Sequence, residues 1–195
     1  MEDLATRQLQ QLLNAKNQFP EIVLLKTTTT STNDDMREIA QKGISSGLVC
    51  SAQQTQGRGQ HQRQWVSPEG NIYLSTLIQT KTALDGRLAL EVALNILQMP
   101  SLQGLSLQIK WPNDLLVGGK KLAGILTELR AEVDQVKFIV LGIGLNVNHS
   151  ESQLIEGATS LKQEASNPFP RVVLMQEILR SLEKWYTRLN KEGFS

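Results

Sequence analysis

The chain has 195 residues, of which 40% are hydrophobic and 20% charged, an ordinary composition for one globular domain with a substantial core. Its formal net charge is only +1, so no overall field draws it to DNA, RNA or an anionic membrane, and no apolar run is long enough to cross a bilayer. A single cysteine excludes an internal disulfide, and two histidines without a Cys/His cluster argue against a zinc site.

The first part of the chain predicts alternating helices and strands. In chain order these are a helix over 1–20, a short buried strand over 22–25, a helix from Ser31 to Gly43, and strands over 48–54 and 71–79. Pro20 and Gly43 are typical helix terminators. Asp34 and Asp35 suit the positive end of the helix dipole. Cys50 falls within a predicted strand, where we expect a buried core thiol.

The second part predicts a strand-rich middle and a long final helix. In chain order these are a helix over 84–99, a strand over 107–111, hairpin strands over 114–117 and 121–130, a turn over 132–134, a strand over 137–148 and a helix over 170–190. Gly118-Gly119 is a good hairpin turn. The apolar stripe of the last helix indicates core packing. Together these elements predict a mixed α+β domain.

The most informative segment follows Gln54 and runs from Gly57 to Trp65 with the sequence GRGQHQRQW. Glycines let a backbone approach an anion closely, so that successive N–H groups can contact phosphate or carboxylate oxygens. Arg58 and Arg63 add charge, and Trp65 offers a flat face for a base. Taken alone, the segment is equally consistent with a flexible loop that contacts nucleic acid.

Four polar clusters occur at predicted strand or helix ends, where sheet-based domains build their sites. They are Ser31-Thr32-Asn33, Gln54 with the glycine loop, Lys110-Trp111-Pro112-Asn113-Asp114, and Gly142 to Asn148. The first two clusters supply neutral donors and acceptors that suit an amide or urea, although a helix cap would explain the first equally well. Lys110 is either a surface charge or a clamp for an anion, and Asn113 could simply form a turn. Close backbone packing could explain the glycines of the last cluster, which leaves Asn146 as its candidate functional side chain.

These clusters, together with Trp65 and the segment Lys121–Glu128, resemble the catalytic domain of biotin–protein ligases in order and spacing over about residues 25–150. The resemblance implies a fold like the class II aminoacyl-tRNA synthetases, with a mixed, largely antiparallel sheet and flanking helices. It also implies a cytoplasmic enzyme that couples biotin to ATP, with Mg²⁺, to give biotinyl-5′-adenylate and pyrophosphate. The adenylate then acylates a lysine of a biotin carboxyl carrier protein, a subunit of acetyl-CoA carboxylase.

Site residues follow from the resemblance position by position. Catalysis is expected of Lys110 and Arg58, which would offset the repulsion between a carboxylate and a triphosphate. The biotin-binding residues would be Ser31, Thr32, Asn33, Gln54, Gly57, Arg58, Gly59, Gln60 and Lys110. The ATP- or adenylate-binding residues would be Arg63, Trp65, Asn113, Lys121 and Asn146. We expect the glycine loop to act as a lid that excludes water. The sequence identifies neither the metal ligands nor a base for the acceptor lysine.

Two departures from the family pattern lead to further predictions. The family loop usually reads Gly-Arg-Gly-Arg-x-Gly, and here Gln60 and Gln62 replace the second arginine and the last glycine. We therefore expect the adenylate to escape faster than from relatives that keep the arginine. We expect no N-terminal helix-turn-helix and no small C-terminal β-barrel after Lys191, and the chain would then be either a minimal ligase or a shortened form of a longer one. The prediction is a single catalytic domain over 1–195 (core about 22–150, C-terminal helical segment 152–190) that does not repress transcription.

Two other functions remain open at this point, as does the oligomeric state, since relatives occur as monomers and dimers. One function is a lipoate ligase or octanoyl transferase of the same fold, and the transferase could use Cys50 as its nucleophile. The neutral polar clusters favour a urea head group instead. The other is a non-catalytic regulator that binds biotin or a nucleotide, against which Lys110 and Arg58 argue.

Overall fold

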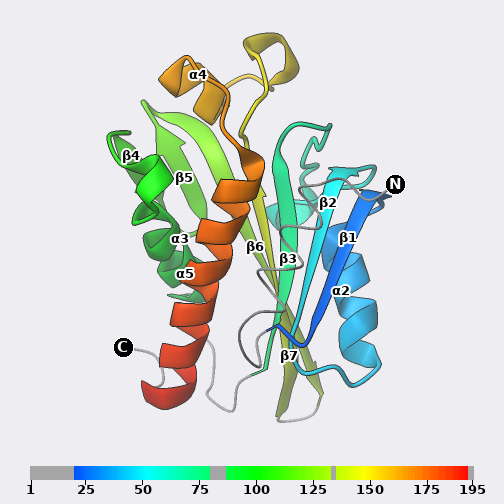
Figure 1. Ribbon diagram of the computed structural model, residues 1–195. Helices are drawn as coiled ribbons and strands as arrows, with labels where there is room; N and C mark the ends of the chain where they lie inside the picture. The colour runs from blue at the N-terminus through cyan, green and yellow to red at the C-terminus, as the bar shows by residue number, and fades with distance from the viewer. Residues whose placement is uncertain (1–19, 80–86, 133–134, 193–195) are drawn as a thin grey trace.

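A seven-stranded sheet forms the centre of the molecule in a computed structural model that describes residues 20–79, 87–132 and 135–192 (Figure 1). The strands are β1 (Ile22–Thr29), β2 (Gly47–Gln54), β3 (Ile72–Ile78), β4 (Leu107–Lys110), β5 (Asp114–Val117), β6 (Lys120–Glu132) and β7 (Gln135–Leu145). The helices are α2 (Thr32–Gln41), α3 (Arg87–Leu97), α4 (Leu161–Ala165) and α5 (Arg171–Glu192). Short 3₁₀ turns are η1 (Gln60–Gln62), η2 (Pro100–Leu102) and η3 (Glu151–Gln153). The helix predicted over 1–20 lies outside the described residues.

The strand order is β1-β2-β3-β7-β6-β5-β4. β1 pairs with β2 in parallel, and every other neighbouring pair is antiparallel. This confirms the predicted mixed, largely antiparallel sheet with flanking helices. Gly118 and Gly119 join β5 to β6 with φ angles of 56° and 79°, the positive values that a two-residue type I′ hairpin turn requires.

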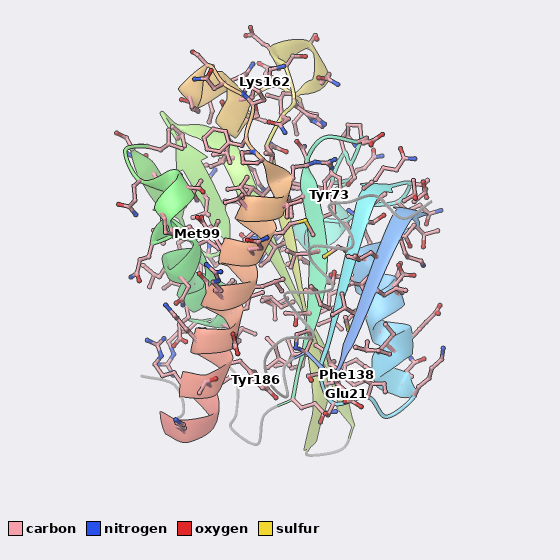
Figure 2. All side chains as sticks on the ribbon, viewed as in Figure 1. Glu21, Tyr73, Met99, Phe138, Lys162 and Tyr186 are labelled. Carbon is pink, nitrogen blue, oxygen red and sulfur yellow. The ribbon has the colours of Figure 1, made fainter. Side chains whose placement is uncertain are left out.

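Helices cover both faces of the sheet (Figure 1), so most of its side chains are buried. α3 and α5 pack on one face in the larger core, while α2 contributes Met36 and Ala40 to the smaller core on the other. Figure 2 shows side chains of both cores, with Met99 labelled in the first and Phe138 in the second. Every residue of β3 is buried because this strand lies between the two cores. None of the described helices has the length and apolar character needed to span a membrane.

Two predicted strands differ from the structure. The strand predicted to be buried over 22–25 is the edge strand β1, in which Ile22 and Leu24 are 39% and 37% exposed. It also runs on through polar residues to Thr29, because its register with β2 supplies backbone partners as far as Gln54. The strand predicted over 137–148 ends at Leu145, and the Asn146 N–H donates to the Leu122 carbonyl beyond the paired strands.

Candidate functional site

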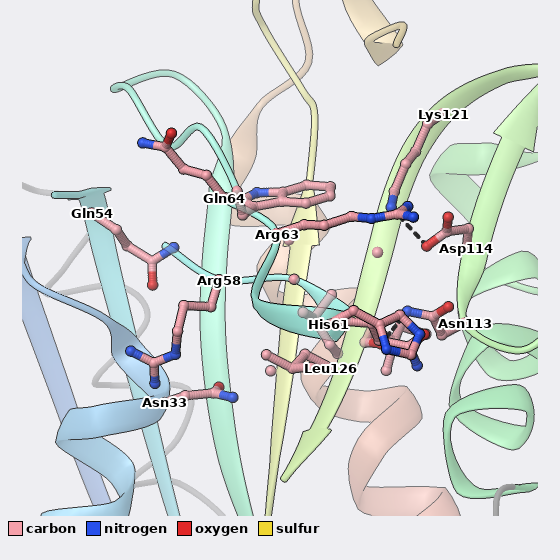
Figure 3. Close-up of a pocket in the computed structure, with 18 of the residues that line it drawn as sticks. Asn33, Gln54, Arg58, His61, Arg63, Gln64, Asn113, Asp114, Lys121 and Leu126 are labelled. Carbon is pink, nitrogen blue, oxygen red and sulfur yellow. Dashed lines mark hydrogen bonds and ion pairs between the residues drawn. The ribbon is translucent and has the colours of Figure 1, made fainter. Parts of the chain in front are cut away.

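A cavity of about 370 Å³ opens beside the N-terminus of α2, the glycine loop and strands β4 to β7. Twelve of the predicted site residues line it: Ser31, Thr32, Asn33, Gln54, Arg58, Gly59, Gln60, Arg63, Trp65, Lys110, Asn113 and Lys121. Figure 3 shows Gln54, Arg58 and Asn33 on one side of this space and Lys121, Asp114 and Asn113 on the other. The fold thus brings together residues from four separate sequence segments.

The neutral end of the cavity is built on the first turn of α2. Ser31, Thr32 and Asn33 are each less than 5% exposed. The expected helix cap is wrong in its details, because the Ser31 side chain makes no capping hydrogen bond. Instead the Gln54 Oε1 accepts from the Thr32 backbone N–H at 2.9 Å, while Gln54 Nε2 donates to Ser67 Oγ at 2.9 Å. Gln54 therefore caps the helix from the neighbouring strand, and its amide orientation is fixed by both contacts.

Behind this turn, a chain of hydrogen bonds connects α2 to the sheet. Ser75 Oγ, on β3, contacts both Thr32 Oγ1 and Asn33 Oδ1, and Asn33 Nδ2 donates to Glu128 Oε2 at 2.6 Å. Gly142 lies against Asn33 so closely that a Cβ at this position would overlap the amide. Sequence reasoning gave Ser75 and Glu128 no role. The place of Glu128 at the end of the matched segment Lys121–Glu128 was the available signal.

Arg58 is held by carboxylates in this structure. Its guanidinium makes two hydrogen bonds of 2.7 Å with Asp34 and lies 3.7 Å from Glu128. Arg37 lies 3.2 Å from both carboxylates, so two cations and two anions form a closed ring. Hydrogen bonds from Arg58 hold the pKa of Asp34 below its ordinary value, and the same contact raises the pKa of Arg58. Asp34 therefore acts as an ion-pair partner in addition to its predicted favourable place in the helix dipole.

Trp65 lies on a floor made of glycines. Cβ atoms added to Gly144 and Gly124 would fall 2.6 Å and 3.0 Å from its indole ring. The backbone N–H of Trp65 donates to the Gly57 carbonyl at 2.9 Å, and the backbone N–H of Gly59 donates to the Arg63 carbonyl at 2.7 Å. These backbone hydrogen bonds close the glycine loop. Gly57 itself does not line the cavity, and it packs against the Trp65 carbonyl and the Ser67 hydroxyl.

Positive charge gathers at the other end of the cavity. Lys110 is the exposed last residue of β4, and no ion pair joins it to another residue in the described ranges. Lys121 Nζ lies 2.8 Å from Asp114 Oδ1 and 5.1 Å from the centroid of the Trp65 ring. Arg63 is exposed and extends across the cavity toward this pair (Figure 3). Asn113 is anchored, because its Nδ2 donates to the Ile125 carbonyl at 2.9 Å.

Two predicted functional side chains lie apart from this cavity. Asn146 lines a smaller hollow on the other side of Trp65, and its amide is engaged by Asn71 and by the Thr159 carbonyl. Its contact with adenine therefore stays a prediction. Cys50 is buried as expected, and burial raises the pKa of its thiol to about 12. A neutral thiol outside the cavity is no nucleophile.

Within the described part of the chain, no group of three or more His, Cys, Asp or Glu side chains could hold a metal ion by itself. Asp114 is the one carboxylate among the described residues that line the cavity. The site therefore combines buried neutral polar groups, an aromatic floor and several cations, of which Lys110 and Arg63 are exposed. Such a set can hold a ligand with a neutral polar head and an anionic portion.

Comparison with known proteins agrees with this geometry. The bifunctional ligase/repressor BirA of Bacillus spizizenii is 36% identical over 89% of this chain, which spans only 56% of that relative's length. The biotin–[acetyl-CoA-carboxylase] ligase of Paracoccus denitrificans is 30% identical over 86% of this chain and 74% of its own length. A biotin protein ligase from Aquifex aeolicus, solved with biotin and ATP, superposes with a TM-score of 0.75 at 25% identity, covering 89% of this chain and 73% of that one.

A family model also matches the chain, over the part that holds the cavity. It describes the biotin/lipoate A/B protein ligase family and covers residues 23–146, which include the glycine loop, the first turn of α2 and the β6–β7 hairpin. These are the elements that surround the cavity. On this evidence the chain belongs to the biotin/lipoate A/B protein ligase family.

Proposed function

We propose that this chain is the catalytic domain of an ATP-dependent biotin–protein ligase, which forms biotinyl-5′-adenylate and transfers biotin to a lysine of a biotin carboxyl carrier protein. One observation carries the proposal: a single cavity has buried, neutral hydrogen-bonding groups at one end and exposed cations at the other. Biotin has the matching chemistry, since its head is a neutral urea and its tail ends in a carboxylate. The activity of the Paracoccus relative and the biotin bound to the Aquifex enzyme support the same substrate.

The neutral end would bind the urea. Thr32, Asn33 and Gln54 are already oriented by hydrogen bonds, so little rotamer entropy remains to be lost when a ligand binds. Ser31, which is also buried here, would contribute a further hydroxyl. Preorganised polar groups of this kind reject ligands that cannot satisfy them.

The cationic end would bind the carboxylate and the phosphates of MgATP. Lys110 and Arg58 would offset the negative charge that accumulates as the carboxylate attacks the α-phosphorus and pyrophosphate leaves. Arg63 and Lys121 would contact phosphate oxygens, and Trp65 would stack against the adenine. Asp114 fits the metal that accompanies ATP, because Mg²⁺ is usually bound through one or two carboxylates and the substrate's own phosphates.

The second step would need the adenylate to be retained and protected from water. The glycine loop, from Gly57 to Trp65, would cover the adenylate until the acceptor lysine arrives. The acceptor would belong to the biotin carboxyl carrier of acetyl-CoA carboxylase, the enzyme named in the Paracoccus relative. We expect the proposed reaction to take place in the cytoplasm.

A two-stage assay tests the proposal. The protein is incubated with MgATP and biotin, and pyrophosphate release is measured; a carrier domain is then added and modification of its lysine is followed by mass spectrometry. We expect pyrophosphate release only with biotin, and a mass increase that corresponds to one biotin. Equal transfer of lipoate or octanoate would support a lipoyl enzyme instead, and biotin binding without pyrophosphate release would indicate a non-catalytic regulator.

The buried state of Cys50 argues against the octanoyl transferase alternative. Such a transferase would need a nucleophile that reaches the cavity, but Cys50 is 4% exposed and does not line it. Its raised pKa of about 12 keeps the thiol protonated at neutral pH.

A further inference from the structure

Glu128 lies behind the neutral end of the cavity, where it connects the sheet to α2. Its Oε2 accepts from Asn33 Nδ2 at 2.6 Å and from Arg37 at 3.2 Å. Glu128 does not line the cavity, whereas Asn33 does. Glu128 can therefore act on a ligand only through neighbours that line the cavity, which are Asn33 at 2.6 Å and the more distant Arg58 at 3.7 Å.

The carboxylate fixes the direction of the hydrogen-bond chain. An ionised carboxylate can only accept, so the Asn33 amide must turn its Nδ2 toward Glu128 and its Oδ1 toward Ser75. Asn33 Oδ1 in turn can only accept, so the single hydroxyl proton of Ser75 is committed to it. Ser75 must then accept from Thr32 Oγ1, which lies 2.7 Å away. All protons in the chain thus point from Thr32 toward Glu128.

This direction determines what the cavity offers to a ligand. Thr32 Oγ1 lies 3.2 Å from Gln54 Oε1 but only 2.7 Å from Ser75 Oγ. Because the Ser75 proton is committed to Asn33, the Thr32 proton is directed at the nearer Ser75, which leaves Thr32 Oγ1 with a free acceptor lone pair. Gln54 Oε1, which is held in place by the Thr32 N–H and by the anchoring of its Nε2 on Ser67, is a second acceptor at this end. Acceptors at this end of the cavity suit the two N–H groups of a urea.

We propose that Glu128 is a positioning residue for biotin recognition: through Asn33 and Ser75, its carboxylate fixes the Thr32 hydroxyl as a hydrogen-bond acceptor. The inference rests on the proposed function only for the identity of the ligand. Arg37 contacts the same Glu128 oxygen as Asn33, and it closes a ring of charges with Asp34, Arg58 and the Glu128 carboxylate. The ring holds Glu128 in place, whereas the direction of the chain depends on the carboxylate alone.

Substitution Glu128→Gln tests this, because it keeps the shape of the side chain but adds a donor. The Asn33 amide could then face either way, and the chain could run in both directions. We expect the KM for biotin to rise roughly tenfold, the usual effect of losing one oriented hydrogen bond, with the KM for ATP changed by less than about twofold. Arg37→Met is the matched control, since it removes the ring but keeps the acceptor, and it should change the biotin KM by less than about threefold.

A double-mutant cycle distinguishes a role of Glu128 in the hydrogen-bond chain from a general contribution of Glu128 to the stability of the fold. Ser75→Ala interrupts the chain between Asn33 and Thr32, so adding Glu128→Gln to it should raise the biotin KM little further. Strictly additive effects, an unchanged biotin KM in Glu128→Gln, or an equal increase in Arg37→Met would each overturn the inference.

Failure of the proposed function would be visible separately, as a wild-type protein that releases no pyrophosphate with biotin. The same variants would then be compared by calorimetric titration with biotin. An affinity that falls only when the Glu128 carboxylate is lost would support the positioning role, and an affinity unchanged by Glu128→Gln would overturn it.

Discussion

The two ends of the cavity differ in how far their side chains are already committed. At the neutral end, Thr32 and Asn33 are buried and Gln54 is half-buried, and all three are bonded to one another or to the fold behind them. At the cationic end, Lys110 and Arg63 are exposed, and Lys121 pairs with Asp114. The neutral end is therefore preorganised for one arrangement of ligand hydrogen-bonding groups. The exposed cations of the other end can still move toward negative charge that develops during the reaction.

Arg58 shares one property with each end of the cavity. It is a cation on the cavity wall, yet Asp34 already holds it with two hydrogen bonds. A preorganised charge costs little reorganisation when the reaction occurs, whereas an exposed lysine must first be ordered. Specificity would thus arise mainly at the neutral end and rate acceleration mainly at the cationic end.

Lys110→Ala should produce the largest effect, because it removes an exposed positive charge from the cationic end of the cavity. We expect biotin-dependent pyrophosphate release to fall about a hundredfold, or about 3 kcal/mol in the barrier. Lys120→Ala is the matched control: Lys120 is also exposed but does not line the cavity, so its loss should have little effect. Near-normal adenylate formation by Lys110→Ala would refute the assignment.

Gly144→Ala tests how tightly the Trp65 ring is packed against the glycines of the β6–β7 hairpin, compared with the hydrogen-bonded groups of the neutral end. A Cβ there would fall 2.6 Å from the Trp65 ring, so the indole must move. We expect a loss of about 1–3 kcal/mol in the free energy of unfolding, with a change in tryptophan fluorescence. Gly59→Ala is the milder comparison, because its Cβ would meet only the Arg63 carbonyl at 3.6 Å. Equal stability of the two variants would contradict this account of the floor.

Gln60→Arg would add a cation to Arg58 and Arg63 of the glycine loop and so extend the cationic end of the cavity. Gln60 lines the cavity, so an arginine there could contact the adenylate phosphate. We expect the adenylate to dissociate roughly tenfold more slowly, equivalent to about 1.4 kcal/mol. The dissociation rate of labelled biotinyl-5′-adenylate measures this, and equal rates for wild type and variant would count against it.

Asp34→Asn should have the smallest effect and a characteristic pH dependence. Because Arg58 lowers the folded-state pKa of Asp34, the ion pair stabilises the fold above the ordinary carboxyl pKa of about 3.9. That contribution is lost as the pH falls through the lowered pKa. We expect wild type to exceed the variant by no more than about 1 kcal/mol at pH 7, since the pair is partly exposed.

Urea unfolding at pH 7 and near pH 3 measures this difference in stability. It should shrink at the lower pH, and Glu156→Gln, at an exposed carboxyl, should show no such change. A difference that grows as the pH falls would have the wrong sign for an ion pair between Asp34 and Arg58.

The sequence predicted the sheet, the hairpin turn at Gly118-Gly119 and twelve of the residues that line the cavity. The individual strands and the turn depend on local signals, such as glycine pairs and alternating apolar residues, whereas the largely antiparallel sheet and the site residues were implied by the family resemblance. It could not show that Gln54 caps α2, because that bond joins residues 22 positions apart. The edge position of β1 was equally invisible, since strand order depends on pairing between distant segments.

Long-range polar contacts explain the remaining differences. Glu128 meets Asn33 across 95 positions, and no local pattern around either residue indicates the contact. Asn146 looked functional because it follows a glycine-rich strand, but its amide holds the chain near Asn71 and Thr159. In both cases the role of the side chain depends on its hydrogen-bond partner, which lies far away in the sequence, and not on the local sequence motif.

Gly124 and Gly144, which form the floor beneath Trp65, are also cross-strand partners in the β6–β7 register. The space for the indole is therefore created by omitting two adjacent side chains from an otherwise continuous hairpin, so no strand has to bend. The weak strand preference of glycine is tolerated because β6 and β7 pair along most of their length. A side chain at Gly124 or Gly144 would occupy the space of the Trp65 indole, and the ring could then no longer pack flat against the hairpin.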